Sequence, residues 1–111
     1  MTQTLTEGPG GVQGFDGYIR TVVRELGVPI ENWCCSTDPP MEAIVQIEGM
    51  LPGHPGRDVA LVWGEKLGWA LAVETRSGED MIIVRELGGE PMPAPSVVRA
   101  FANLVELPRR A

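Results

Sequence analysis

The chain has 111 residues, which is room for one domain, and its hydrophobic content of 43% is typical of a globular protein and not of a disordered one. Fifteen acidic residues against nine basic ones give a formal net charge of −6, which opposes binding to nucleic acid. No apolar run approaches the ~20 residues that span a bilayer, and the first residues lack the basic and apolar segments of a signal peptide. We therefore expect a cytoplasmic protein that binds neither nucleic acid nor membrane.

The first fourteen residues carry four glycines and few large apolar side chains, and we expect them to form a flexible leader. From Phe15 onward, apolar residues at helical spacing predict a helix over about residues 16–26. Asp16 is its expected N-cap, and Gly27 stands where a left-handed residue ends a helix. The expected organisation is thus a leader over 1–14, one domain over 15–108 and a tail over 109–111.

Segments rich in β-branched and aromatic residues follow the helix and predict strands, near residues 30–36, 43–48, 58–63, 69–75 and 81–87. The connections between the last three are short enough for hairpin turns, at residues 64–68 and 76–79. Pro95 suits the first turn of a second helix that runs to about Leu107. The prediction is an α+β fold, in which N- and C-terminal helices pack on one face of an antiparallel meander of four or five strands.

The hydrophobic pattern of the first strong hairpin predicts its register. All its large side chains share one face if an odd loop, of three or five residues, joins the strands, so that Val59, Leu61 and Trp63 lie opposite Val73, Leu71 and Trp69. The helices then cover this face.

The opposite face of the sheet is unusually apolar for a solvated surface, since it carries Ala60, Val62, Ala70 and Ala72, with Ile83 beside them if the next strand alternates. Something must cover such a surface. The hypothesis is a homodimer through these five residues. The alternative is a covering segment of the same chain, either the leader or the loop over 49–57.

The residues with catalytic or metal-binding chemistry do not form a motif. His54, the only histidine, lies in a proline- and glycine-rich loop and is expected to be solvated, although an enzyme using it with Asp58 or Cys35 is the third hypothesis. Cys34 and Cys35 are adjacent and lack the two-residue spacing of a metal site. We therefore expect no catalytic residue, no metal and no cofactor.

The three tryptophans allow two interpretations. Trp33, Trp63 and Trp69 are either core anchors whose indole N–H groups bond to loop carbonyls, or, for the last two, an exposed ledge on which a ligand or peptide stacks. On the second interpretation the candidate binding residues are Trp63, Trp69, Trp33, His54 and Arg57.

Several short segments resemble a known family. They are Gly17-Tyr18-Ile19-Arg20, Leu26-Gly27-Val28-Pro29, Pro55-Gly56-Arg57-Asp58, Leu61-Val62-Trp63, Gly68-Trp69-Ala70-Leu71, Leu87-Gly88-Gly89 and Val97-Val98-Arg99-Ala100-Phe101. Together they resemble an actinobacterial family of small proteins catalogued as a domain of unknown function, number 6292, over about residues 14–106. The resemblance implies a cytoplasmic bacterial protein and no assigned activity, so it transfers no functional residues.

Two functions rank above the enzyme hypothesis and remain open from the sequence. The first is a non-catalytic interaction or accessory protein that presents a surface to a protein partner. The second is a small-ligand-binding regulatory module, with a pocket between the two helices and the Trp63/Trp69 end of the sheet.

Overall fold

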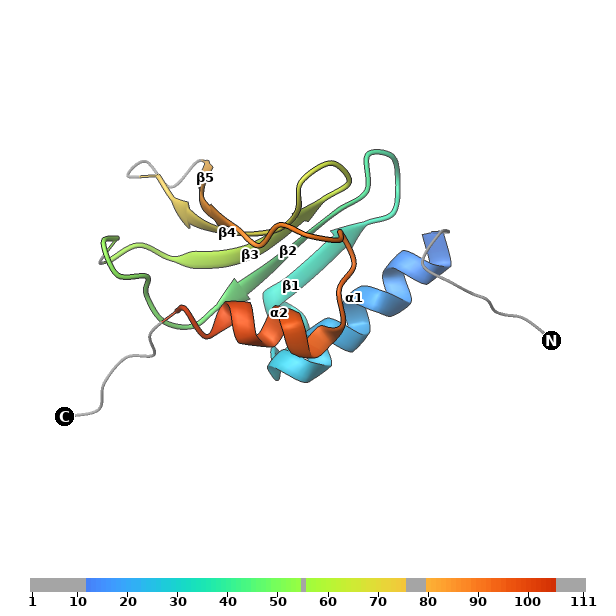
Figure 1. Cartoon of the computed structure of the whole chain (residues 1–111), viewed down its shortest axis with the longest axis horizontal. Coiled ribbons are helices and arrows are strands. Elements are labelled where there is room, and N and C mark those ends of the chain that lie inside the picture. Colours follow the sequence, from blue (N-terminus) through green and yellow to red (C-terminus); the bar gives the residue numbers. More distant parts are fainter. Residues whose placement is uncertain (1–11, 55, 76–79, 106–111) are drawn as a thin grey trace.

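The computed structural model describes residues 12–54, 56–75 and 80–105 of the chain (Figure 1). Its centre is an antiparallel sheet in which every strand pairs with the next strand in sequence, in the order β1-β2-β3-β4-β5. The strands are β1 (Trp33–Ser36), β2 (Glu42–Ile47), β3 (Val59–Gly64), β4 (Gly68–Glu74) and β5 (Met81–Glu86). The expected meander is confirmed with five strands. The first expected strand is shorter than predicted, because residues 30–32 form a 3-10 turn, η2 (Ile30–Asn32).

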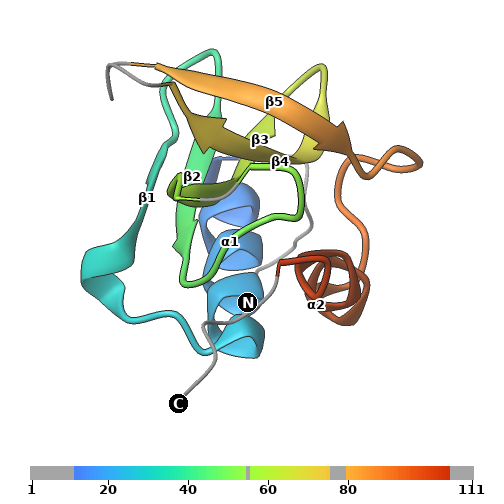
Figure 2. The same cartoon turned by 90° about the vertical axis from the view of Figure 1, so that its left-hand side faces the viewer.

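Two helices, α1 (Val12–Leu26) and α2 (Pro95–Ala102), lie on the same side of the sheet (Figure 2). Pro95 occupies the first turn of α2, as expected. The chain then turns at Asn103, so α2 ends before the expected Leu107, and the proposed tail over 109–111 lies outside the described residues. None of the described helices is long and apolar enough to cross a membrane.

The start of α1 differs from the prediction. The helix begins at Val12, so Asp16 lies inside it and is not its N-cap; its carboxylate instead accepts a bond from Arg20 Nε at 2.9 Å. The reason is that Phe15 and Ile19 are completely buried. Their burial outweighs the cost of about 1 kcal/mol for each glycine in the first turns. Residues 12–14 thus belong to the helix and not to the expected leader, whose residues 1–11 lie outside the described part of the chain.

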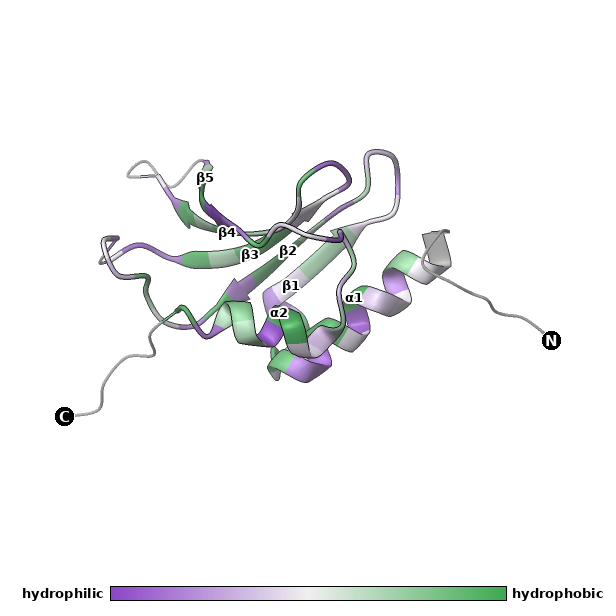
Figure 3. Ribbon diagram, in the orientation of Figure 1, coloured by the Kyte–Doolittle hydropathy of each residue, from purple (hydrophilic) through white to green (hydrophobic). Residues whose placement is uncertain are grey.

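The register of the β3–β4 hairpin is the predicted one. Trp63 lies opposite Trp69, Leu61 opposite Leu71 and Val59 opposite Val73, across a loop of residues 65–67. These large side chains face the helices and form the core with Phe15, Ile19 and Val22 of α1 and Val98 and Phe101 of α2. Figure 3 shows apolar residues following one another along β3. This continuity arises because β3 carries apolar residues on both faces of the sheet.

Candidate functional site

The side of the sheet that faces away from α1 and α2 is the most distinctive surface of the molecule, and we call it the outer face. Directly opposite residues share a face, so the pairings define two rows across it. One row is Ile44, Val62, Ala70 and Glu86, and the other is Gln46, Ala60, Ala72 and Ile83. Met81 lies on the same side, opposite Glu74. No described helix covers these residues (Figure 2).

The apolar residues of the outer face differ widely in their solvent exposure. Ala60, Ala70 and Ala72 are at most 2% exposed within the single chain, and each has at least one longer side chain beside it in its row. Val62 is half-buried. The accessible apolar surface lies on both sides of the alanines, where Ile44 on β2 is 39% exposed and Ile83 on β5 is 40% exposed. Three of the five residues assigned to a dimer interface therefore have almost no area left to bury.

Acidic side chains border this surface. Glu42 at one end of β2 and Glu86 at one end of β5 are exposed, and Glu74 at the end of β4 is half-buried. These carboxylates add to the acidic balance of the chain, whose formal net charge is −6. A protein surface that matches the outer face is thus apolar and flanked by basic side chains.

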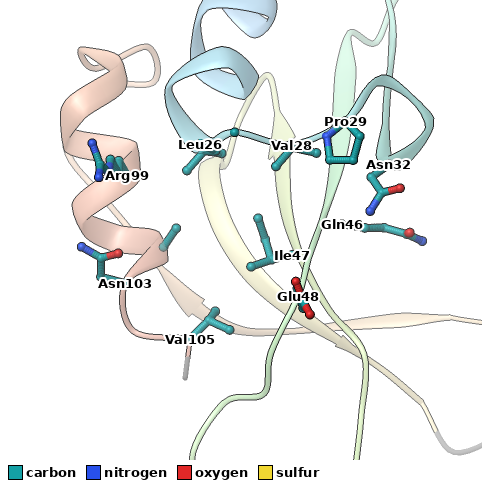
Figure 4. A pocket seen from close by; sticks show the side chains of 12 residues that line it. Leu26, Val28, Pro29, Asn32, Gln46, Ile47, Glu48, Arg99, Asn103 and Val105 are labelled. Atoms are coloured by element: carbon teal, nitrogen blue, oxygen red, sulfur yellow. The ribbon is translucent and has the colours of Figure 1, made fainter. Parts of the chain in front are cut away.

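A pocket of about 430 Å³ lies on the other side of the sheet, among the C-terminal ends of α1 and α2 and the end of β2 (Figure 4). Its apolar wall includes Leu26, Val28, Ile47 and Val105. Polar groups at its border include Arg99, which donates to the Glu25 carboxylate at 3.2 Å. Ile47 pairs with Val59, whereas Trp63 pairs with Ala43, so this pocket lies at the opposite end of the sheet from the tryptophans.

The sequence model of a family of unknown function, DUF6292, matches residues 18–104. The chain belongs to this family. The match spans most of the described fold, including the whole outer face and all the pocket lining except Val105, and it confirms the resemblance inferred from the short segments. No curated protein and no solved structure is detectably similar to this family member.

The tryptophan end of the sheet is a core element in this member of DUF6292. Trp63 and Trp69 are 5% and 1% exposed, so they do not form the exposed ledge of the binding interpretation. The indole of Trp63 donates to the carbonyl of Pro91 at 2.7 Å. The indole of Trp69 donates to the Tyr18 hydroxyl at 2.9 Å, which in turn donates to the carbonyl of Pro93 at 2.7 Å. The two tryptophans thus hold the proline-rich segment before α2 against the sheet.

Trp33 and Cys35 lie where β1 passes α1. The Arg20 guanidinium is 5.7 Å from the centre of the Trp33 ring, a cation–π distance, and also pairs with Asp16. The Cys35 thiol lies 3.7 Å from the other Asp16 oxygen. Burial, and then the neighbouring Asp16 carboxylate, raise the pKa of this thiol. Cys35 is therefore held in its unreactive, protonated form, while Cys34 points to the outer face and is exposed.

His54 and Arg57 lie in the loop between β2 and β3, and they do not share a site. His54 lines a hollow of about 170 Å³ beside Val84 of β5 and Leu104, and no carboxylate in the described part of the chain bonds to it. Arg57 donates to the backbone carbonyl of Glu74 at 3.1 Å and so fastens the loop to β4. Cys35 is on β1, at the opposite edge of the sheet from β5, which lines the same hollow as His54. Among the described residues no cluster of three or more His, Cys, Asp or Glu could hold a metal ion.

Two features escaped the sequence analysis. The Tyr18 hydroxyl joins segments that are 75 residues apart, and nothing in the local pattern of a helix reveals such a partner. Ile44 was part of a predicted strand, but its place on the outer face follows only from the β2–β3 register. The β2–β3 connection is a long loop, which fixes register less tightly than a hairpin does.

Proposed function

We propose that this protein is a non-catalytic interaction protein, which uses its outer face to bind a protein partner. The observation that carries the proposal is the exposed apolar surface of Ile44, Met81 and Ile83, which no described helix covers. A contiguous exposed apolar patch is typical of an interaction site. The acidic border favours a partner whose apolar contact is flanked by lysine or arginine.

The non-catalytic part of the proposal is supported by the separation of the reactive side chains. His54 lies near β5, Cys35 lies on β1, and the Cys35 thiol is kept protonated by its surroundings. A general base needs its nucleophile or substrate proton within hydrogen-bonding reach, and these two groups do not meet. We also propose a cytoplasmic location, as expected in the sequence analysis.

The test is affinity purification from the cells that make the protein, with three tagged versions compared by quantitative mass spectrometry. Ile44→Lys adds a charge to the outer face, and we expect it to reduce recovery of a specific partner by roughly tenfold or more. Ile30→Lys is the matched control, since Ile30 is 73% exposed on η2, away from the outer face. Equal recovery of every retained protein by all three versions would refute the proposal.

A second candidate function is the binding of a small ligand in the pocket between the helix ends. A volume of about 430 Å³ favours it, because ligand pockets typically span about 300–1,000 Å³. The expected site at the Trp63/Trp69 end is replaced by this one, since the indoles there are buried and hydrogen-bonded. A fragment library screened by NMR should shift the amides of Ile47 and Val28 if the pocket binds ligands. Shifts confined to other residues would exclude this function.

A further inference from the structure

The strand β5 is an open edge of the sheet. It pairs with β4 on one side, and within the described residues nothing lies beyond it on the other (Figure 2). Edge strands are commonly protected by charge, proline, a bulge or short length. The other edge strand, β1, has only four residues. In β5 the bulge and both charged residues fall in the second half, at and after Val84, which leaves Met81, Ile82 and Ile83 unprotected.

The backbone hydrogen bonds between β4 and β5 determine which backbone groups of β5 point outward. Thr75 N–H donates to the Asp80 carbonyl at 2.9 Å, so the backbone of Asp80 points toward β4. Along an antiparallel strand the backbone N–H and C=O groups of successive residues point alternately to the two sides. The backbone groups of Ile82 therefore also point toward β4, while those of Met81 and Ile83 point to the free edge. The side chain of Ile82 lies on the helix side, opposite Val73, and those of Met81 and Ile83 lie on the outer face.

We infer that β5 pairs with β5 of a second copy of this chain, in the antiparallel register that places Ile82 opposite Ile82 and Met81 opposite Ile83. In this register the free N–H and C=O groups of Met81 meet those of Ile83 twice around a two-fold axis, which forms four backbone hydrogen bonds. The side chains also match, since each pair is apolar and both members lie on the same face.

The charge and the exposed area of β5 both bear on its pairing with a second copy of the chain. Residues 81–84 contain no ionisable group, so the pairing brings no like charges opposite each other despite the net charge of −6. Met81, Ile82 and Ile83 are 37%, 47% and 40% exposed, and a contact this short buries less than the roughly 1,600 Å² of a standard stable interface. We therefore expect a weak dimer, with a dissociation constant on the order of tens of micromolar.

The inference deepens the proposed function, because the two joined sheets form one continuous outer face, twice as wide. It rests on the proposed function only in that a partner uses this widened face. Met81 and Ile83 of each copy then lie at its centre, and the two Ile44 side chains lie toward its two ends. Partner binding through Ile44 and self-pairing through Ile82 are tested by different variants, so the failure of one is distinguishable from the failure of the other.

Sedimentation equilibrium over roughly 5–500 µM brackets the expected dissociation constant. We expect the mass of the wild-type protein to rise from 12.0 kDa toward twice that value. Ile82→Lys should weaken the association at least about tenfold, because it places two ammonium groups at the two-fold axis. Ile44→Lys is the matched control, since Ile44 is a similarly exposed isoleucine on β2, and it should dimerise as the wild type does. A wild-type protein that stays monomeric, or a dimer that Ile82→Lys leaves intact, overturns the inference.

Disulfide trapping tests the register in a Cys34→Ser, Cys35→Ser background. Opposite residues of a non-hydrogen-bonded pair have Cα atoms about 4.5 Å apart, within the range of a disulfide, so Ile82→Cys should give a covalent dimer on mild oxidation. Met81→Cys is the control in the same strand. Its two copies are offset by two residues, ~7 Å along the strand, which exceeds disulfide reach once the strand spacing is added. Equal trapping of both variants, or faster trapping of Met81→Cys, contradicts the register.

Discussion

Tyr18 joins three segments of the chain through a single hydroxyl group, which accepts from Trp69 and donates to the Pro93 carbonyl. Tyr18→Phe leaves both groups without this partner in the interior, so we expect the free energy of unfolding in urea to fall by about 1–3 kcal/mol. Thr21→Val is the control, because it removes an exposed bond to the Gly17 carbonyl and should change stability by less than about 0.5 kcal/mol. Equal losses would argue against the bridging role.

The same hydroxyl makes stability depend on alkaline pH. Burial raises the pKa of Tyr18 above its ordinary value of 10.0; the bond from Trp69 lowers it, and Glu90 raises it further. The folded state therefore keeps a proton that the unfolded state releases. The stabilisation is complete at a pH below the ordinary tyrosine pKa, and it is lost as the pH rises through the raised pKa of the folded state. Because the chain has one tyrosine, tyrosinate absorbance reports this group directly. We expect a midpoint above 10.0 in the folded protein, and a midpoint at or below it would contradict the assignment.

The adjacent cysteines should differ sharply in reactivity. Cys34 is exposed on the outer face, whereas Cys35 is half-buried against Asp16 with a raised thiol pKa. Since the thiolate is the reactive form, we expect alkylation at neutral pH to show a fast phase and a phase at least about tenfold slower. Cys34→Ser should remove only the fast phase. Loss of the slow phase in that variant would reverse the assignment.

At the scale of the elements, the β3–β4 hairpin could be predicted in detail because its pattern leaves one acceptable register. Any even loop would move Leu71 and Trp69 away from the helices, and burial of these large side chains outweighs any local preference of the loop. The start of α1 could not be predicted in the same way. Gly14 suggests a later start by local propensity, and the tertiary burial of Phe15 overrides that preference.

The loop of this hairpin depends on one of its two flanking glycines. Gly68 has a φ of +74°, and a Cβ there would lie 3.5 Å from the Cα of Pro91. We expect Gly68→Ala to lower the free energy of unfolding by about 1 kcal/mol, because alanine is strained at positive φ. Gly64→Ala is the control, since Gly64 has open space around it and lacks a positive φ. It should change stability by a few tenths of a kcal/mol at most, measured by the same urea titration.

At the scale of the whole molecule, the sequence indicated an apolar second face but not which part of it is accessible. The alternation of Ala60, Val62, Ala70 and Ala72 is visible in the sequence. Their burial depends on longer neighbours that only the pairing of β2 and β5 brings alongside them. The pocket between the helix ends could not be predicted from the sequence either, because its lining comes from α1, β2 and α2. The relative placement of these elements is set by tertiary packing. The accessible apolar side chains are therefore those of the two flanking strands and not the alanines that the sequence suggested.

Amide hydrogen exchange should reveal the open edge in the free chain. In β4 every amide is enclosed between two paired strands, so Ala72 and Val73 should both exchange slowly. In β5 the directions alternate, so at low micromolar concentration we expect slow exchange at Ile82 and fast exchange at Met81 and Ile83. At several hundred micromolar, pairing with a second copy should slow Met81 and Ile83 and leave Ala72 unchanged. Uniform protection along β5 at every concentration would mean that its outward N–H groups are bonded within one chain, and the edge would then be closed to any partner.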